Sequence, residues 1–334
     1  MQQIYLDNAA TTPVRPEVEE VMQPYFCEKY GNPSGIYKMA SECRQALETV
    51  RKQIGETLKV SAEEIYFTSG GTESDNWAIK STAQRLKEKG KHIITSKIEH
   101  HAVLNSCAYL ETQGFEVTYL DVDEWGCVRF DALQRAIRKD TILISIMYAN
   151  NEVGTIQPIG QIGKIAKESD IFFHTDAVQA YGQLPIDVKK ENIDLLSASA
   201  HKFNGPKGVG FLYIRKKIPL PEYIHGGKQE RDHRAGTENV PGIAGLGLAA
   251  KMIYQDLNMK VSLMRELKAH FIEGVSKIEH TTVHGLTDEN SAPHIISVGI
   301  AGVRSEVLLH TLEDKGIYVS SGSACASNHP AISG

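Results

Sequence analysis

Apolar side chains along the chain follow two alternating periods. Residues 16–30 and 41–58 carry apolar positions at helical spacing, which predicts amphipathic helices. Short apolar runs bounded by glycine and polar residues predict buried strands at 65–68, 92–96, 115–120, 141–150, 171–178 and 208–214. Helical patterns lie between several of these runs. One begins at residue 72, and two others cover residues 101–114 and 159–169. Strands that alternate with helices indicate an α/β domain with a largely parallel sheet, buried on both faces.

The pattern changes after residue 242. Two long helical patterns cover 243–257 and 261–278, followed by a strand at 294–300, a helix at 305–316 and a strand at 317–321. The chain of 334 residues is long enough for two domains. We expect a large α/β domain over residues 15–250 and a smaller α+β domain made of residues 1–14 and 251–334.

Charge and cysteine content exclude several classes of protein. The 36 basic residues are scattered among 41 acidic ones, for a net charge of -5, which argues against nucleic acid or a membrane surface as the main partner. No long apolar run and no secretory signal pattern are visible, so we expect a cytoplasmic location. The five cysteines show no C-x-x-C pair, which predicts neither a disulfide framework nor a structural zinc site.

Two chemically suggestive residues follow predicted strands, where ligands bind in open α/β sheets. Lys202 lies in a loop after a short strand, and desolvation there would free its amine for a Schiff base; an exposed loop lysine is the alternative. Asp176 ends a buried strand, where a carboxylate requires a cationic partner, unless it caps the next helix. A carboxylate on a pyridine nitrogen beside a Schiff-base lysine is the recurrent arrangement for pyridoxal phosphate.

Other strand ends carry polar groups that also have local explanations. The segment SGGTES, residues 69–74, offers backbone N–H groups and the Thr72 hydroxyl to a phosphate, or forms an ordinary glycine turn. His100 and His101 follow a strand, but two adjacent histidines cannot both face one metal from a helix. Asn150 and Asn151 are typical of turns.

Eight segments, in order, carry a family resemblance over essentially the whole chain. They are LDNAATTP, SGGTES, EHHAV, NNEVG, HTDAVQ, HKFNGPKGVG, HGGKQERDHRAGTEN and SSGSACAS. Together they strongly resemble the cysteine desulfurases of the NifS and IscS type, which depend on pyridoxal 5'-phosphate. The resemblance implies the type I aminotransferase fold, with a large, mainly parallel, seven-stranded sheet domain and a smaller α+β domain. It also implies conversion of L-cysteine to L-alanine.

The resemblance also assigns roles to individual residues of this sequence. Lys202 would form the Schiff base and later move protons, His100 would stack on the cofactor ring, and Asp176 would hold the ring nitrogen protonated. The remaining implied contacts are Gln179 and Asn151 near the phenolic oxygen, and Gly71, Thr72, Ser199 and His201 on the phosphate. Thr237 would reach the phosphate in a neighbouring subunit, which implies a homodimer.

Cys325, in the segment SSGSACAS, would attack the substrate sulfur and carry it as a persulfide. We expect residues near Cys325 to be poorly ordered or far from Lys202. The sulfur would then pass to an acceptor protein for iron–sulfur cluster assembly or tRNA thiolation. Two alternatives remain: an aminotransferase or selenocysteine lyase that does not use Cys325, and an inactive sulfur or iron scaffold with Cys325 as a transient cluster ligand. No resident metal is expected.

The sequence departs from the family pattern in two places. Gly35 and Tyr37 stand where the family more often has serine and histidine, and Lys228 and Asp232 replace glycines of another loop. Family members also continue past the cysteine to an arginine that binds the substrate carboxylate. Because the sequence stops at Gly334 before such an arginine, we expect it to be cut short.

Overall fold

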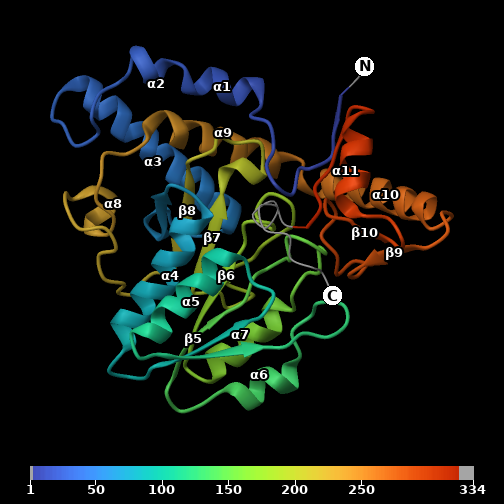
Figure 1. The fold of residues 1–334 in the computed structure, drawn as a ribbon. Helices are drawn as coiled ribbons and strands as arrows, with labels where there is room; N and C mark the ends of the chain where they lie inside the picture. The colour runs from blue at the N-terminus through green and yellow to red at the C-terminus, as the bar shows by residue number, and fades with distance from the viewer. Residues whose placement is uncertain (1–2, 323–334) are drawn as a thin grey trace.

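A seven-stranded sheet forms the centre of the molecule (Figure 1), and the computed structural model describes residues 3–322. Its strand order is β2 (Ile65–Thr68), β8 (Gly210–Ile214), β7 (Leu195–Ser199), β6 (Phe172–Asp176), β5 (Thr141–Ser145), β3 (His92–Ser96) and β4 (Glu116–Leu120). β8 runs antiparallel to both of its neighbours, and the remaining pairs are parallel. The predicted mainly parallel sheet is therefore confirmed.

Helices cover both faces of the sheet, which explains why its strands are continuous apolar runs. In β3, Ile93 packs with α4 (Gly71–Leu86) and α5 (His101–Thr112) on one face. The next residue, Ile94, joins the larger core cluster on the other face, with α3 (Lys38–Leu58), α7 (Ile159–Glu168) and α9 (Val240–Gln255). Because successive residues of a strand point to opposite faces of the sheet, one strand contributes side chains to the core on both faces.

A smaller α+β part lies beside the sheet (Figure 1). It contains α10 (Leu257–Val275), the antiparallel pair β9 (Thr281–His284) and β10 (Ser297–Ile300), α11 (Ser305–Glu313) and β11 (Ile317–Tyr318). β11 pairs in parallel with β1 (Ile4–Tyr5), so the first and last described strands lie side by side. Among the described residues, no helix is long and apolar enough to cross a membrane.

Several predicted elements have different bounds in the structure. The helix predicted over 16–30 is two helices, α1 (Pro16–Met22) and α2 (Pro24–Cys27), because Pro24 has no amide hydrogen for a continuous helix. The strands predicted at 141–150, 294–300 and 317–321 are shorter, and α6 (Phe130–Ala136) and β9 were not predicted. These differences leave the order of the main elements unchanged.

The loop after residue 225 contains an unusual turn, α8 (Gln229–Asp232). Glu230, Arg231 and Asp232 have φ values of 46°, 56° and 65°, a left-handed conformation that costs about 1–2 kcal/mol for each non-glycine residue. Glu230 accepts two hydrogen bonds from the Arg51 guanidinium, at 2.7 and 2.8 Å, and both side chains are buried. Asp232 therefore has a left-handed backbone conformation that a glycine would adopt without strain. The ion pair between Arg51 and Glu230 stabilises the turn in this conformation.

The departures at Gly35 and Tyr37 are in contact. A Cβ atom on Gly35 would lie 2.7 Å from Cε1 of the Tyr37 ring, which is exposed. A side chain at position 35 would therefore require the Tyr37 ring to turn away.

Substitution of Glu230 by glutamine tests the ion pair that holds the turn. The change removes the buried carboxylate of this pair and leaves Arg51 beside Glu48, whose side chain is more than half exposed, so we expect the free energy of unfolding to fall by about 3 kcal/mol. Chemical denaturation monitored by circular dichroism measures the loss. Glu63→Gln is the matched control, because Glu63 and Lys216 form an exposed pair whose loss costs less than about 1 kcal/mol. Equal effects of the two substitutions would contradict this prediction.

Candidate active site

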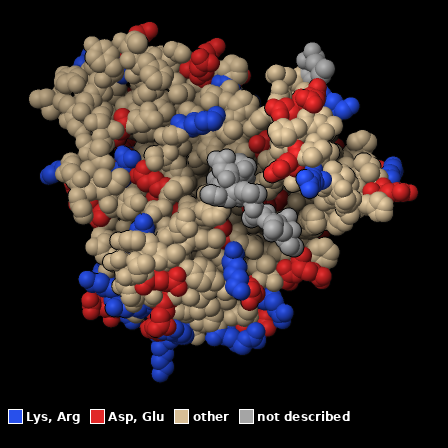
Figure 2. All heavy atoms as spheres, in the orientation of Figure 1, with Lys and Arg blue, Asp and Glu red and all other residues tan. Residues whose placement is uncertain are grey.

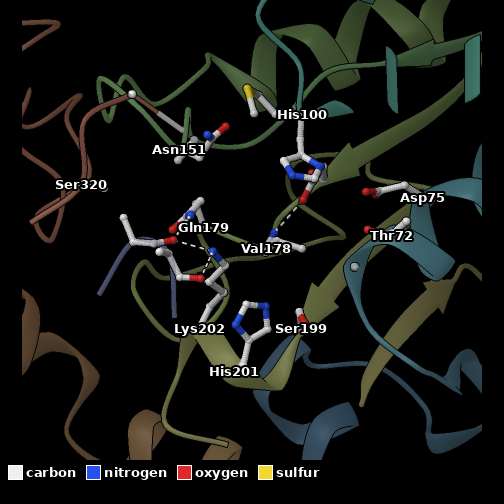
Figure 3. A pocket seen from close by; sticks show the side chains of 17 residues that line it. Thr72, Asp75, His100, Asn151, Val178, Gln179, Ser199, His201, Lys202 and Ser320 are labelled. Atoms are coloured by element: carbon white, nitrogen blue, oxygen red, sulfur yellow. Dashed lines mark hydrogen bonds between the residues drawn. The ribbon is translucent and has the colours of Figure 1, made fainter. Parts of the chain in front are cut away.

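A pocket of about 270 Å³ opens at the carboxyl ends of the central strands (Figure 3). Its volume lies close to the lower end of the range for small-molecule sites, roughly 300–1,000 Å³. It is lined by Ala9, Ala10, Gly71, Thr72, Asp75, His100, Met147, Ala149, Asn151, Asp176, Val178, Gln179, Ser199, His201, Lys202, Ser320 and Gly322. Every predicted cofactor-binding residue except Thr237 is in this set. The structure therefore brings residues from separate strand ends into one cavity.

Lys202 ends a short 3₁₀ helix, Ala200–Lys202, that directly follows β7, so the predicted loop after the strand begins with a helical turn. Its Nζ donates hydrogen bonds to the backbone carbonyls of Ala9 and Ala10. The Gln179 side chain donates to the same Ala9 carbonyl at 2.9 Å (Figure 3). The N-terminal segment thus directs the amine of Lys202 into the pocket.

Asp176 faces the pocket from the end of β6, and His100 faces it from the segment that follows β3, on the far side of β5. The Asp176 side chain accepts a hydrogen bond from the amide of Val178 at 2.9 Å, so it caps a turn and lines the pocket as well. Burial raises the pKa of Asp176, whereas His100 and Lys202 nearby lower it. Burial also lowers the pKa of His100, whose Nδ1 accepts the amide hydrogen of Ala102 at 3.1 Å. A cation bound beside Asp176 would stabilise its charged form.

A second hollow adjoins the pocket and shares four residues with it, namely Gly71, Thr72, Ser199 and His201. These are the residues that the family resemblance assigns to the phosphate. They surround the N-terminus of α4, a helix of 16 residues whose first N–H groups and dipole favour an anion. A Cβ on Gly71 would lie 2.5 Å from Cγ2 of Val178, so only glycine leaves this space open.

Two predicted site residues are not placed in this pocket, one because it lies elsewhere and one because it is not among the described residues. Thr237 is exposed, and its loop is held by the Arg234 guanidinium, which donates to Glu73 in α4 at 2.7 Å. Cys325 lies outside the described residues, so the predicted position of its segment is not tested. Ser320 and Gly322, which precede it, line the pocket.

The sequence reasoning missed several polar residues around the pocket. Asp75 lies in α4, one helical turn after Gly71, and this spacing places both on one face of the helix. His294 contacts Gln179 at 3.2 Å from the smaller part of the molecule, and Lys207 lines the second hollow. No group of three or more His, Cys, Asp or Glu side chains in the described residues is placed to hold a metal ion.

The comparison with known proteins identifies the family. The family model for aminotransferase class V matches residues 4–333. The chain belongs to this family. Within it, the chain is 56% identical to the cysteine desulfurase IscS of Methanosarcina thermophila, over 97% of this chain and 80% of that protein. This identity places the chain among the cysteine desulfurases, as the sequence motifs predicted.

Solved structures of related proteins agree with this assignment. A structure described as a NifS-like protein superposes with a TM-score of 0.93 at 41% identity, covering 96% of this chain and 88% of that one. A second, described as SspA in complex with cysteine, has a TM-score of 0.85 at 38% identity, covering 98% and 91%. The predicted type I aminotransferase fold is confirmed.

Substitution of Gly71 by alanine tests the phosphate cradle. The added methyl group must displace Val178 and narrows the space that an anion would occupy. We expect the affinity for pyridoxal phosphate to fall by about 10-fold, which corresponds to about 1.4 kcal/mol. Titration of the cofactor-free protein, followed by fluorescence, measures the affinity.

Gly160→Ala is the control for the cradle substitution. Gly160 also lies in the first turn of a helix, but the nearest atom to its added Cβ would be 3.9 Å away. This variant should bind the cofactor as the unsubstituted protein does. An unchanged affinity in Gly71→Ala would show that the phosphate lies elsewhere.

Proposed function

We propose that the chain is a pyridoxal phosphate-dependent L-cysteine desulfurase that converts L-cysteine to L-alanine. The observation that carries this proposal is the convergence of Lys202, Asp176 and the anion cradle on one pocket. Each group suits a different part of the cofactor, namely its aldehyde, its ring nitrogen and its phosphate. The names of the relatives, and the bound cysteine in the description of one of them, support the same substrate.

The pocket fits pyridoxal phosphate by its donors and its charges. Gly71, Thr72, Ser199 and His201 would hold the phosphate at the N-terminus of α4. Asp176 would pair with the ring nitrogen, while Asn151 and Gln179 would hydrogen-bond near the phenolic oxygen. When bound, the cofactor withdraws electrons from the α-carbon of the amino acid and so makes its proton acidic.

Proton transfer in the pocket is assigned to Lys202. Its Nζ is already oriented by the carbonyls of Ala9 and Ala10, so little further ordering is needed before it acts as an acid or base. His100 supplies a flat ring that would stack on the cofactor and exclude water from one side. Burial lowers the pKa of His100, which favours a neutral ring beside a protonated cofactor nitrogen.

Sulfur transfer is assigned to Cys325. Its thiolate would attack the substrate sulfur, forming a sulfur–sulfur bond as the carbon–sulfur bond breaks, and the substrate β-carbon would take up a proton. The products are L-alanine and a persulfide on Cys325. The segment that leads to this cysteine reaches the pocket at Ser320 and Gly322. An acceptor protein of iron–sulfur cluster assembly or tRNA thiolation would then take the sulfur.

A homodimer is part of the same proposal. Thr237 is exposed and does not line the pocket of its own chain, so it could serve the pocket of a second copy. Large apolar side chains are also exposed around α2, namely Phe26, Tyr30, Ile36 and Tyr37. Figure 2 shows few charged atoms over this region, at the upper left, whereas Lys and Arg alternate with Asp and Glu on the lower part.

The cytoplasmic location stays a prediction.

Two substitutions separate cofactor binding from sulfur transfer. Lys202→Ala should abolish the visible absorbance of the lysine-bound cofactor and lower alanine formation by at least about 10²–10⁴-fold. Cys325→Ser should retain that absorbance but form no persulfide, so sulfide release from L-cysteine should stop. Absorbance spectra and alanine and sulfide assays measure these effects.

Cys27→Ser is the control for the thiol, because Cys27 is an exposed cysteine in α2, outside the residues that line the pocket. It should keep full activity. Unchanged sulfide release in Cys325→Ser would favour an aminotransferase or selenocysteine lyase that does not use this thiol. Absence of the cofactor band in cofactor-supplemented protein would favour the inactive scaffold.

A further inference from the structure

Three carboxyl groups are buried together at the base of the pocket. Asp75 in α4, Glu99 in the turn after β3, and Asp176 at the end of β6 are only 1%, 5% and 6% exposed. Asp75 and Asp176 both line the pocket, and Figure 3 shows the carboxyl group of Asp75 directed into it. Three negative charges in this position would repel one another strongly, because the buried site is poorly screened by water.

Hydrogen bonds distinguish the three groups. Asp176 accepts the Val178 amide and lies near the cationic Lys202. Glu99 accepts hydrogen bonds on Oε1 from the Ser96 hydroxyl at 2.6 Å and the Met147 amide at 3.0 Å. Its Oε2, by contrast, is buried and has no hydrogen-bond partner among residues 3–322.

Asp75 resembles Glu99 in this respect. Its Oδ1 is buried and likewise has no hydrogen-bond partner in the described part of the chain. A buried charged oxygen without a donor is far more costly than a neutral one. The hydrogen-bond pattern therefore favours a neutral form for Asp75 and Glu99, and an ionised form only for Asp176.

The histidine nearest to Asp75 cannot supply a compensating charge. His174 Nε2 lies 3.6 Å from Asp75 Oδ1, and its ring is held between the hydroxyls of Ser145, at 2.8 Å, and Ser197, at 3.0 Å. Burial lowers the pKa of His174 to about 3, so the ring is neutral. Burial and nearby Asp176 raise the pKa of Asp75 well above its usual value, although a hydrogen bond from Ser197 lowers it, and burial raises the pKa of Glu99 to about 8.

We propose that Asp75 and Glu99 are neutral, proton-bearing positioning residues that leave Asp176 as the only anion of this cluster. The single negative charge of Asp176 then neutralises one positive charge on the ring of a bound ligand. A ligand with two positive charges would be bound less favourably. Identification of that ligand as pyridoxal phosphate rests on the proposed function. The protonation of the two carboxyl groups follows from the described residues alone.

Infrared spectroscopy of the cofactor-free protein at neutral pH tests this proposal directly, because protonated carboxyl groups and carboxylates absorb at different frequencies. Asp75→Asn and Glu99→Gln should each remove a protonated-carboxyl band from the difference spectrum. Glu63→Gln, which removes an exposed carboxyl group paired with Lys216, should remove only carboxylate bands. Loss of carboxylate bands in Asp75→Asn and Glu99→Gln would overturn the proposal.

Cofactor affinity provides a second test that does not depend on turnover. An amide has the shape of a neutral carboxyl group, so Asp75→Asn and Glu99→Gln should bind pyridoxal phosphate within about 3-fold of the unsubstituted protein. Asp176→Asn should bind at least about 30-fold more weakly, because it leaves a buried positive charge unpaired. Weakening in Asp75→Asn equal to that in Asp176→Asn would overturn the proposal. Full affinity in Asp176→Asn would instead contradict the proposed function.

Discussion

The burial of Asp176 at the carboxyl end of β6 is the constraint on which the site depends. A carboxylate in that position is stable only beside positive charge, and the surrounding elements meet this need in different ways. β7 leads into the turn that carries Lys202, while α4 directs its positive N-terminal end toward the other side of the pocket. The proposed cofactor completes the arrangement, because its ring nitrogen and phosphate match these two environments.

The N-terminal segment connects the smaller α+β part to this chemistry. It leaves the β1–β11 pair, passes the pocket at Ala9 and Ala10, and reaches His201, whose carbonyl accepts from the amide of Thr12 at 2.8 Å. The carbonyls that orient Lys202 thus belong to a turn that follows β1, the strand that pairs with β11 from the far end of the sequence.

Sequence patterns predicted the sheet and placed Asp176 and Lys202 at strand ends, because the parallel strands bring successive strand ends to one edge. Gln179, Ser199 and His201 were implied by the family resemblance. They did not predict contacts between distant segments, such as Gln179 with His294 or Arg51 with Glu230. Glu230 carries no local signal for its left-handed conformation, which depends on a buried partner far away in the sequence. Asp75 could have been found from its helical spacing to Gly71, but its burial against other carboxyl groups requires the fold.

The central claim is that Lys202 is the amine that holds the cofactor, and chemical trapping tests it most directly. Borohydride reduction of protein supplied with pyridoxal phosphate fixes the cofactor on the lysine that binds it, and peptide mass spectrometry then locates that lysine. The account predicts stoichiometric modification of Lys202 and none of the neighbouring Lys207, which lines only the adjoining hollow. Modification of another lysine, or of none, would contradict it.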